Sequence, residues 1–246
     1  MSDAGWALVT GAARRIGKAL ALAAAQAGYD VIVHHRASAQ AASQTAREVE
    51  SLGRRAQVAE LDFNGSDPAE LLSAAPGAVT LLVNCASTFC EDDIETLDRD
   101  ALAGAMTVNL IAPVLLAQAF ARALPGHRSG LIVNIIDQRV WRLTPQFFSY
   151  TLAKAALWTA TQTLAQALAP RIRVNAIGPG PTLASVHQGL GQFEAEVAAI
   201  PLGQGPTPDQ IGKALAYLID APSVTGQMIA VDGGQHLAWQ TPDIVG

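Results

Sequence analysis

Short runs of apolar and β-branched residues recur along the chain, separated by longer segments rich in Ala and Leu. A short apolar run bounded by turn residues is typical of a buried strand, whereas apolar residues three and four apart are typical of a helix. This pattern predicts strands at Trp6–Thr10, Asp30–His34, Gln57–Leu61, Val79–Asn84, Leu131–Ile136, Arg173–Ile177 and Met228–Val231. It predicts helices near Arg14–Ala27, Gln40–Leu52, Pro68–Ala74, Arg99–Leu124, Phe148–Leu168 and Pro208–Ile219.

The order of these elements predicts the fold class. Strands that alternate with helices form βαβ units, whose parallel sheet is covered by helices on both faces. No linker or repeat divides the chain, so we predict one α/β domain over residues 1–246. We expect a Rossmann-type, doubly wound fold with a mostly or wholly parallel seven-stranded sheet. The irregular stretch Gly178–Gly205 is rich in Gly and Pro, and about 181–205 of it is predicted to be a substrate loop.

The composition narrows the possible partners. Half of the residues are hydrophobic (50%), and the net charge is −5 with no run of Lys or Arg. These features argue against nucleic acid or an anionic membrane as the partner. The first residues do not resemble a signal peptide, and no unbroken apolar stretch of about 18 residues occurs. We therefore expect a cytoplasmic protein with no membrane span, acting on a small molecule.

The cysteines and histidines do not indicate a metal or redox site. Cys85 and Cys90 are not in a Cys-x-x-Cys arrangement, which suggests two reduced thiols. The histidines are scattered, and no further ligand is placed to complete a metal set, so we expect surface or loop residues and no metal. These residues are His34, His35, His127, His187 and His236.

Tyr150 and Lys154 form the most informative motif, Tyr-x-x-x-Lys. Residues four apart lie on the same face of a helix. A lysine cation beside a phenol favours the phenolate and lowers the tyrosine pKa from about 10, which makes a proton donor suited to reduction of C=O or C=N bonds. Asp137 lies thirteen residues upstream and adds a carboxyl group. The alternatives are a solvated pair on a helix surface and an Asp137 that only caps a turn.

The segment after the first predicted strand indicates a dinucleotide site. Gly11 and Gly17 open the following helix, and Arg15 stands where the usual pattern has its middle glycine. A glycine turn at this place lets a pyrophosphate reach the free N–H groups of the helix N-terminus. The alternative is a plain turn between a strand and a helix.

The end of the second predicted strand indicates which dinucleotide binds. NAD-binding folds place an acid there for the ribose 2′-hydroxyl, whereas an arginine accommodates a 2′-phosphate. This strand is followed by Arg36 and Ser38, with no acid. Arg36 can pair with phosphate through its planar fork. We therefore predict NADP(H) rather than NAD(H), the alternative being a solvated Arg36.

These motifs resemble the short-chain dehydrogenase/reductase family over nearly the whole chain. Asn84-Cys85-Ala86-Ser87 stands for the family's Asn-Asn-Ala-Gly, Asn109 for its helix asparagine and Gly178-Pro179-Gly180 for its Pro-Gly turn. The resemblance implies a homotetramer and a water at Asn109 that links Lys154 to solvent. The cofactor contacts predicted from the motifs and the resemblance are Gly11, Arg14, Arg15, Ile16, Gly17, His35, Arg36, Ser38, Asp62, Phe63, Asn84, Ala86, Ser87, Tyr150, Lys154 and Gly180.

Two departures make the chain similar to one branch, the pteridine reductases with the dihydromonapterin reductases. Asp137 replaces the family's usual serine and Arg15 its glycine, and Ala86-Ser87-Thr88-Phe89 is similar to that branch as well. The resemblance implies NADPH-dependent reduction of a dihydropterin C=N bond, with Tyr150 as proton donor and Phe89 stacked on the pterin. The catalytic residues are then Asp137, Tyr150, Lys154 and Asn109. The substrate contacts are then Arg15, Ser87, Phe89, Asp137 and Tyr150.

Other functions remain open from the sequence. The nearest is an NADPH-dependent ketone reductase acting on a 3-oxoacyl thioester or a sugar-like carbonyl. A more distant alternative is a cofactor-binding regulator without catalysis. Phe89 can also be a loop residue packed into the core. The sequence does not indicate which pterin is reduced, or whether folate is accepted.

Overall fold

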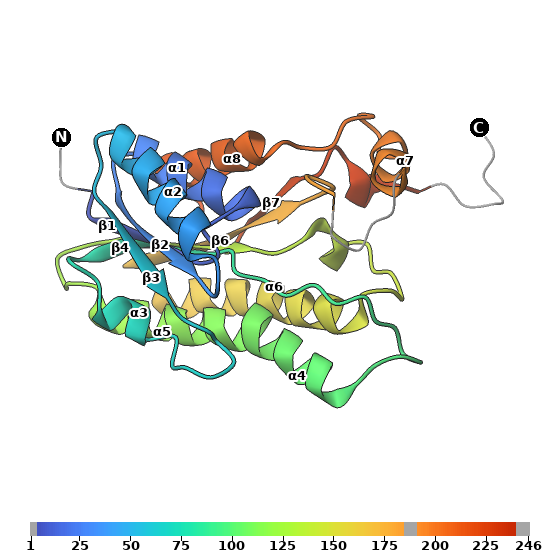
Figure 1. Cartoon of the computed structure of the whole chain (residues 1–246), viewed down its shortest axis with the longest axis horizontal. Coiled ribbons are helices and arrows are strands. Elements are labelled where there is room, and N and C mark those ends of the chain that lie inside the picture. Colours follow the sequence, from blue (N-terminus) through green and yellow to red (C-terminus); the bar gives the residue numbers. More distant parts are fainter. Residues whose placement is uncertain (1–3, 185–190, 240–246) are drawn as a thin grey trace.

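The computed structural model of the protein describes residues 4–184 and 191–239. Its centre is one sheet of seven parallel strands in the order β3-β2-β1-β4-β5-β6-β7 (Figure 1). The strands are β1 Trp6–Val9, β2 Asp30–His35, β3 Ala56–Glu60, β4 Val79–Asn84, β5 Gly130–Ile135, β6 Ile172–Pro179 and β7 Met228–Val231. The predicted doubly wound α/β fold with a parallel seven-stranded sheet is confirmed.

Helices cover both faces of the sheet (Figure 1). One face carries α1 Arg15–Gln26, α2 Ala39–Ser51 and α8 Pro208–Asp220. The other face carries α3 Glu70–Ser73, α4 Arg99–Met106, α5 Ala112–Ala123 and α6 Phe148–Leu168. Shorter elements are the π turn η1 Thr107–Ile111, α7 Gln192–Ala198 and the 3-10 turns η2 Gln138–Val140 and η3 Gln235–Leu237.

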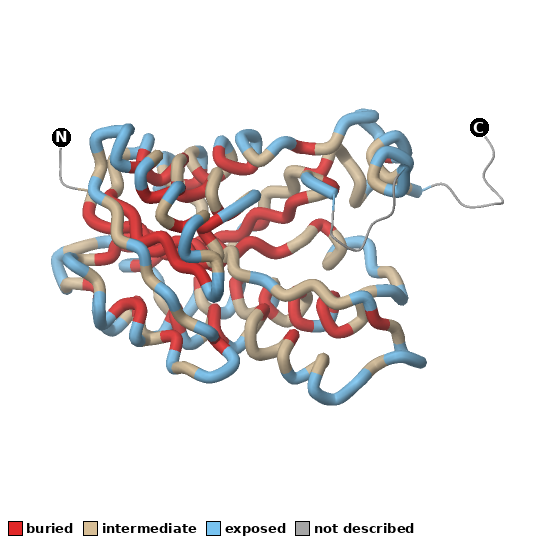
Figure 2. The backbone as a smooth tube through the Cα atoms, viewed as in Figure 1, coloured by how far each residue is buried: buried red, intermediate tan, exposed pale blue. Residues whose placement is uncertain are grey.

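The core consists of two apolar layers, one on each side of the sheet. Along β1, Ala7 and Val9 pack toward α1, α2 and α8, whereas Leu8 packs toward α3 and α5. Strands buried on both faces are continuously apolar, which is why the sequence shows runs rather than alternation. Figure 2 shows the buried backbone concentrated along these strands.

The winding of the chain reverses beside β1. This strand pairs with β2 on one side and β4 on the other, so βαβ units extend in opposite directions from it. In open parallel sheets, ligands bind outside the carboxyl ends of the strands at such a reversal. The fold therefore fixes where a site is expected before any side chain is considered.

The structure differs from the sequence prediction in three elements. The helix predicted over Arg99–Leu124 is α4, the π turn η1 and α5 in succession. The predicted loop 181–205 contains a helix, α7, and the strand predicted over Arg173–Ile177 continues to Pro179. Residues 185–190 of that loop lie outside the described residues, as does the tail after residue 239.

One helical run among the described residues matches a membrane-spanning helix in length and composition. Arg99–Ala123 has 25 residues and a mean hydropathy of 1.6, although the sequence contains no unbroken apolar stretch of that size. Four of its residues, Ala112, Leu116, Ala117 and Phe120, are buried in the apolar layer on the α3 and α5 face of the sheet. We interpret the run as a core helix of the α/β fold, whose buried face requires the same apolar composition.

The expectation that His34 and His35 are surface or loop residues is wrong. Both lie on β2, between β1 and β3, and only 2% and 3% of their surfaces are exposed. Helices cover β2 on both faces of the sheet, so even its polar side chains are buried. The polar character of histidine in the sequence does not reveal this burial. His127 is exposed, His236 is half-buried, and His187 lies outside the described residues.

Candidate active site

A cavity of about 920 Å³ opens at the carboxyl ends of the strands. Its walls come from the turn after β1, the ends of β2 to β5 and the segment after β6. The predicted site residues on these walls are Gly11, Arg15, Ile16, Arg36, Ser38, Asp62, Phe63, Ala86, Ser87, Phe89, Asp137, Tyr150 and Gly180. Those not on the walls are Arg14, Gly17, His35, Asn84, Asn109 and Lys154. The contacts of all these residues with a cofactor or substrate stay predictions.

The turn after β1 requires its two glycines. Gly11 has φ +65°, and a Cβ added to Gly17 would lie 2.1 Å from the carbonyl oxygen of Gly11. No side chain caps the N-terminus of α1, and its first turn holds no acid. The N–H groups of this helix end and its positive dipole therefore favour an anion. Arg15 has φ +54°, a left-handed conformation that is uncommon outside glycine and typical of functional sites.

His34 supports this turn, a role that the sequence analysis missed. Its Nδ1 accepts a hydrogen bond from the Gly11 N–H (3.1 Å), so its Nε2 carries the proton and donates to the carbonyl of Leu61 (3.1 Å). The ring stacks on Phe63 with 4.8 Å between centroids. Burial lowers the pKa of His34 to about 4, so the ring is neutral near pH 7. His34 stands at the end of a predicted strand, directly after an apolar run, and this position could have suggested its contact with the glycine turn.

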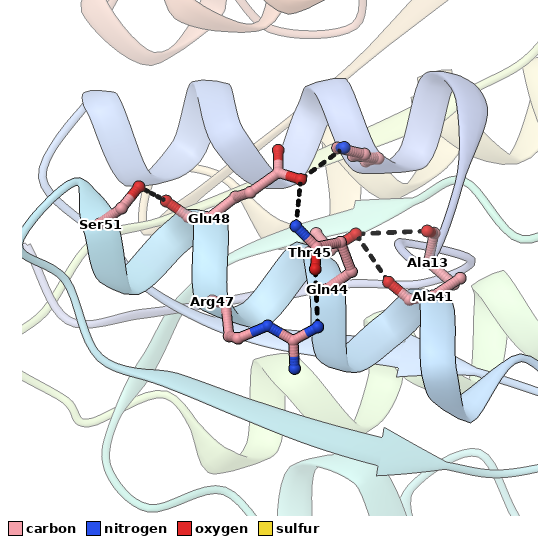
Figure 3. A network of polar contacts seen from close by, with 8 residues as sticks. Ala13, Ala41, Gln44, Thr45, Arg47, Glu48 and Ser51 are labelled. Carbon is pink, nitrogen blue, oxygen red and sulfur yellow. Dashed lines mark hydrogen bonds and ion pairs between the residues drawn. The ribbon is translucent and has the colours of Figure 1, made fainter.

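Helix α2 supports the same turn from the other side (Figure 3). The hydroxyl of Thr45 lies 3.2 Å from the carbonyl oxygens of both Ala13 and Ala41. On the outer surface of α2, Glu48 accepts from Lys18 of α1 at 2.8 Å. These contacts fix α1, α2 and the glycine turn relative to one another.

The end of β2 carries the residues predicted to select the dinucleotide. Arg36 is exposed and Ser38 is half-buried, and both line the cavity. His35 lies beneath them, where its Nδ1 accepts from the N–H of Ser38 (3.2 Å). His35 therefore positions Ser38 and does not itself form the cavity wall.

The end of β4 is joined to β1 by Thr10, which the sequence analysis did not name as a site residue. Its hydroxyl oxygen accepts from the N–H groups of Cys85 (2.9 Å) and Ala86 (3.0 Å). Asn84 does not line the cavity, and its contact with a cofactor stays a prediction. Its amide points into the core and donates to Asn134 at 2.8 Å, because the last residue of a central strand is already surrounded by neighbours.

Asn109 holds the segment after β4 in place. Its Oδ1 accepts from the Ser87 hydroxyl (2.8 Å) and the Thr88 N–H (3.1 Å), and its Nδ2 donates to the Thr88 carbonyl (2.9 Å). The π turn η1, a feature often found at functional sites, carries Asn109 to this position. The predicted water between Asn109 and Lys154 stays a prediction.

Tyr150 and Asp137 meet at the cavity wall. The Tyr150 hydroxyl donates to Oδ2 of Asp137 (3.0 Å), and the main-chain N–H of Arg139 donates to Oδ1 (2.8 Å). Both carboxyl oxygens of Asp137 therefore accept a hydrogen bond. Lys154 donates to the carbonyl of Ile135 (2.8 Å), and its Nζ lies 5.6 Å from the centre of the Tyr150 ring.

The predicted lowering of the Tyr150 pKa is wrong for the protein in this state. Burial, followed by the negative charge of Asp137, raises the pKa of Tyr150 well above its ordinary value. Burial also raises the pKa of Asp137 and lowers the pKa of Lys154 to about 8. The spacing of Tyr150 and Lys154 shows the nearby lysine charge, but it does not show the desolvation of all three groups, which opposes ionisation.

Phe89 belongs to an aromatic group inside the cavity. Its ring stacks on Phe147 with 4.2 Å between centroids and lies edge-to-face with Tyr150 at 4.7 Å. Both phenylalanines line the cavity and are half-buried, so Phe89 is not a core residue.

Arg15 extends from the glycine turn to the predicted substrate loop. Its guanidinium donates to the carbonyl oxygens of Leu183 and Ala184, both at 3.0 Å. Phe193 and Glu196 of α7 also line the cavity. Both described parts of the predicted substrate loop, 181–184 and 191–205, therefore contribute to the cavity walls.

Comparison with known proteins places the chain among oxidoreductases. Residues 11–236 match the family model described as enoyl-(acyl carrier protein) reductase. The chain is similar to the crystal structure of FolM alternative dihydrofolate reductase 1 from Brucella suis in complex with NADP. The two are 48% identical with a TM-score of 0.95, and the match covers 100% of each chain.

Two curated proteins show the same relationship at lower identity. The chain is 30% identical over 238 residues to dihydromonapterin reductase from Escherichia coli O6:K15:H31, covering 94% of this chain and 96% of that protein. It is also 30% identical over 236 residues to 3-oxoacyl-[acyl-carrier-protein] reductase from Synechocystis sp., covering 93% and 95%. With the parallel sheet, the glycine turn and the buried Tyr150 and Lys154, these matches confirm the resemblance. The chain belongs to the short-chain dehydrogenase/reductase family of oxidoreductases.

Proposed function

We propose that this protein is an NADPH-dependent reductase that transfers a hydride to a C=N bond of a dihydropterin. The observation that carries the proposal is the hydrogen bond between Tyr150 and the Asp137 carboxylate at the cavity wall. A carboxylate accepts strongly from the ring N–H and amino groups of a pterin edge, whereas the family's usual serine hydroxyl is a neutral partner. The similar proteins named for dihydrofolate and dihydromonapterin support the same substrate class.

The residues present fit NADP(H). The uncapped N-terminus of α1 and the two close glycines offer a place where a pyrophosphate can approach the backbone. Arg36 and Ser38 would hold the 2′-phosphate, and Lys154 would hold the nicotinamide ribose. The bound cofactor supplies the hydride. The NADP-bound structure of the similar Brucella suis protein supports this choice.

The protein's own residues would handle the proton and the orientation of the ring. Tyr150 keeps its proton at neutral pH, because its pKa is raised, and would donate it to the substrate nitrogen. In the complex, Asp137 would exchange its bond to Tyr150 for one to a substrate N–H, which frees the phenol to donate. The nearby Lys154 ammonium would stabilise the phenolate left behind.

Activity on matched substrates tests this proposal. Oxidation of NADPH is followed with a 7,8-dihydropterin, with dihydrofolate and with an acetoacetyl thioester, and each is repeated with NADH. We expect turnover of at least one reduced pterin and a preference for NADPH. Turnover of the thioester alone would refute the proposed substrate. No oxidation with any substrate would favour a cofactor-binding regulator.

A ketone reductase is the second candidate. The 30% identity to the Synechocystis 3-oxoacyl reductase supports it. The pairing of Asp137 with Tyr150 favours the pterin, because a simple ketone presents no N–H group to the carboxylate. The thioester in the assay above distinguishes the two.

We also expect a homotetramer. A groove of about 730 Å³ lies along α5 and α3, and Ile111 and Leu115 are exposed beside it. Of the α6 residues with small or apolar side chains, Ala153 and Leu157 are buried within the chain itself. The groove is one candidate for contact between subunits, and Leu152 of α6, 41% exposed, is another. Light scattering in solution measures the assembly.

A further inference from the structure

Three side chains form a column at the edge of the cavity. The guanidinium carbon of Arg139 lies 5.0 Å from the centre of the Phe147 ring. The other partner of Phe147 is Phe89, stacked at 4.2 Å with 14° between the planes. Phe89 in turn contacts the Tyr150 ring. The column therefore leads from a cation to the predicted proton donor.

The backbone of Phe147 adopts a strained conformation in this column. Phe147 has φ +54°, an uncommon conformation for a bulky residue. Hydrogen bonds of the residues that follow Phe147 hold it there. The next two N–H groups, of Phe148 and Ser149, donate to the carbonyl and the carboxylate of Asp92, both at 3.1 Å. A strained residue held in place by its neighbours indicates that the ring's position matters to the site.

Arg139 itself is held in a fixed orientation. Its Nη1 donates to the Thr144 hydroxyl (2.9 Å), which donates in turn to the carbonyl of Gln146 (3.3 Å). A guanidinium fixed in this way can stay over the face of Phe147, where the ring quadrupole attracts it.

The same cation acts on the reacting groups. Its positive charge lowers the pKa of both Asp137 and Tyr150, against the larger effect of burial. The other charged or titratable groups that act on this pair are Lys154 from α6 and Cys85 from the end of β4. Arg139 also bonds Asp137 through its main-chain N–H, a contact that any substitution except proline keeps.

We infer that Arg139 is a positioning residue for the reduction: its guanidinium backs the Phe147–Phe89 stack and supplies positive charge beside Asp137. This role rests on the proposed function for its substrate. Arg139 acts in two ways: it supports the Phe147–Phe89 stack, and its charge acts on the Asp137 carboxylate. Substitutions can separate these two effects.

The test compares Arg139→Met, Arg139→Lys and Phe147→Leu, with Arg142→Met as the matched control. Arg142 is an exposed arginine three residues further along. We expect Arg139→Met to raise KM for the ring substrate about fivefold, the size of one cation–π contact at a partly exposed site. It should also move the acid limb of kcat/KM to higher pH, because the Asp137 carboxylate is then protonated more readily. Arg142→Met should change neither quantity.

The other two variants separate the effects. Arg139→Lys keeps the charge but not the planar group, so its KM should rise while the acid limb stays where the wild type has it. Phe147→Leu should raise KM without moving that limb. The inference is overturned if Arg139→Met matches Arg142→Met in both quantities. It is also overturned if the acid limb moves in Phe147→Leu as far as in Arg139→Met.

A crystal structure of the ligand-free Arg139→Met protein makes the test independent of substrate. We expect the Phe147 and Phe89 rings to leave their 4.2 Å stacking. Unchanged rings would contradict the backing role even if a pterin is the substrate. Failure of the proposed function appears separately, as absence of pterin turnover by the wild type. The kinetic comparison then uses the substrate that the wild type reduces.

Discussion

The hydroxyl of Tyr150 donates a hydrogen bond of 3.0 Å to the carboxylate of Asp137. Tyr150 lies in the first turn of α6, whereas Asp137 follows β5 and begins the turn η2. The pair therefore forms only when helix and sheet pack together. Burial raises the pKa of both groups, so the pair stores a proton next to a cavity rather than releasing it to solvent.

Removal of the Tyr150 hydroxyl should abolish most of the turnover. In Tyr150→Phe we expect kcat to fall by a factor on the order of 100 to 10,000, because the positioned proton donor is lost. NADPH affinity, followed by the fluorescence of the bound cofactor, should change little. Retention of wild-type kcat would contradict the role of Tyr150.

Replacement of Asp137 by the family's usual residue should change the substrate preference. In Asp137→Ser we expect kcat/KM for the pterin to fall about 100-fold, because a charged hydrogen-bond acceptor is lost. Reduction of a simple ketone, if detectable, should be maintained or rise. The ratio of the two kcat/KM values measures this effect, and an unchanged ratio would argue against contact between Asp137 and the pterin.

Loss of the Lys154 charge should lower kcat at alkaline pH. The pKa of Lys154 is lowered to about 8 by burial, so kcat should fall as the pH rises through about 8. Unfolding does not explain such a fall. Between pH 8 and the ordinary lysine value of 10.5, the unfolded chain binds the extra proton, so this group's contribution to stability improves. A rate that stays level from pH 7 to 10 would contradict the prediction.

Arg36 should determine the preference for NADPH. In Arg36→Ala we expect the Kd for NADPH to rise at least about tenfold, because a charge-assisted contact with the 2′-phosphate is lost. The Kd for NADH should stay nearly constant. Arg47→Ala on the exposed surface of α2 is the control. An equal loss of affinity for NADPH and NADH would show that Arg36 does not contact the 2′-phosphate.

His34 should make the fold less stable in mild acid. Its folded-state pKa of about 4 lies below the ordinary value of 6.5, so the unfolded chain takes up the proton first as the pH falls. Stability is therefore complete above pH 6.5, and about 3 kcal/mol of it is lost by pH 4. Urea unfolding of His34→Asn should show a smaller loss over this range. His127→Asn, altered at an exposed position, should lose as much as the wild type.

The sequence by itself determined the fold class, the glycine turn and the Tyr150–Lys154 motif. These features are local: a strand buried on both faces needs a continuous apolar run, and a phosphate turn needs glycine where no Cβ fits. The strand order, which the structure supplies, then places the site at the carboxyl ends of the strands. The boundaries of most elements shifted by only a residue or two.

Only the tertiary structure decided the environment of these residues. Burial of His34 on a central strand, the turning of Asn84 into the core and the binding of Thr88 by Asn109 all depend on neighbours distant in the sequence. The same is true of the Tyr150 pKa. Spacing along a helix shows which charge is near, but desolvation depends on how many elements close around the group. The candidate reacting residues could be predicted from the sequence, whereas their burial and pKa values depend on the packed fold.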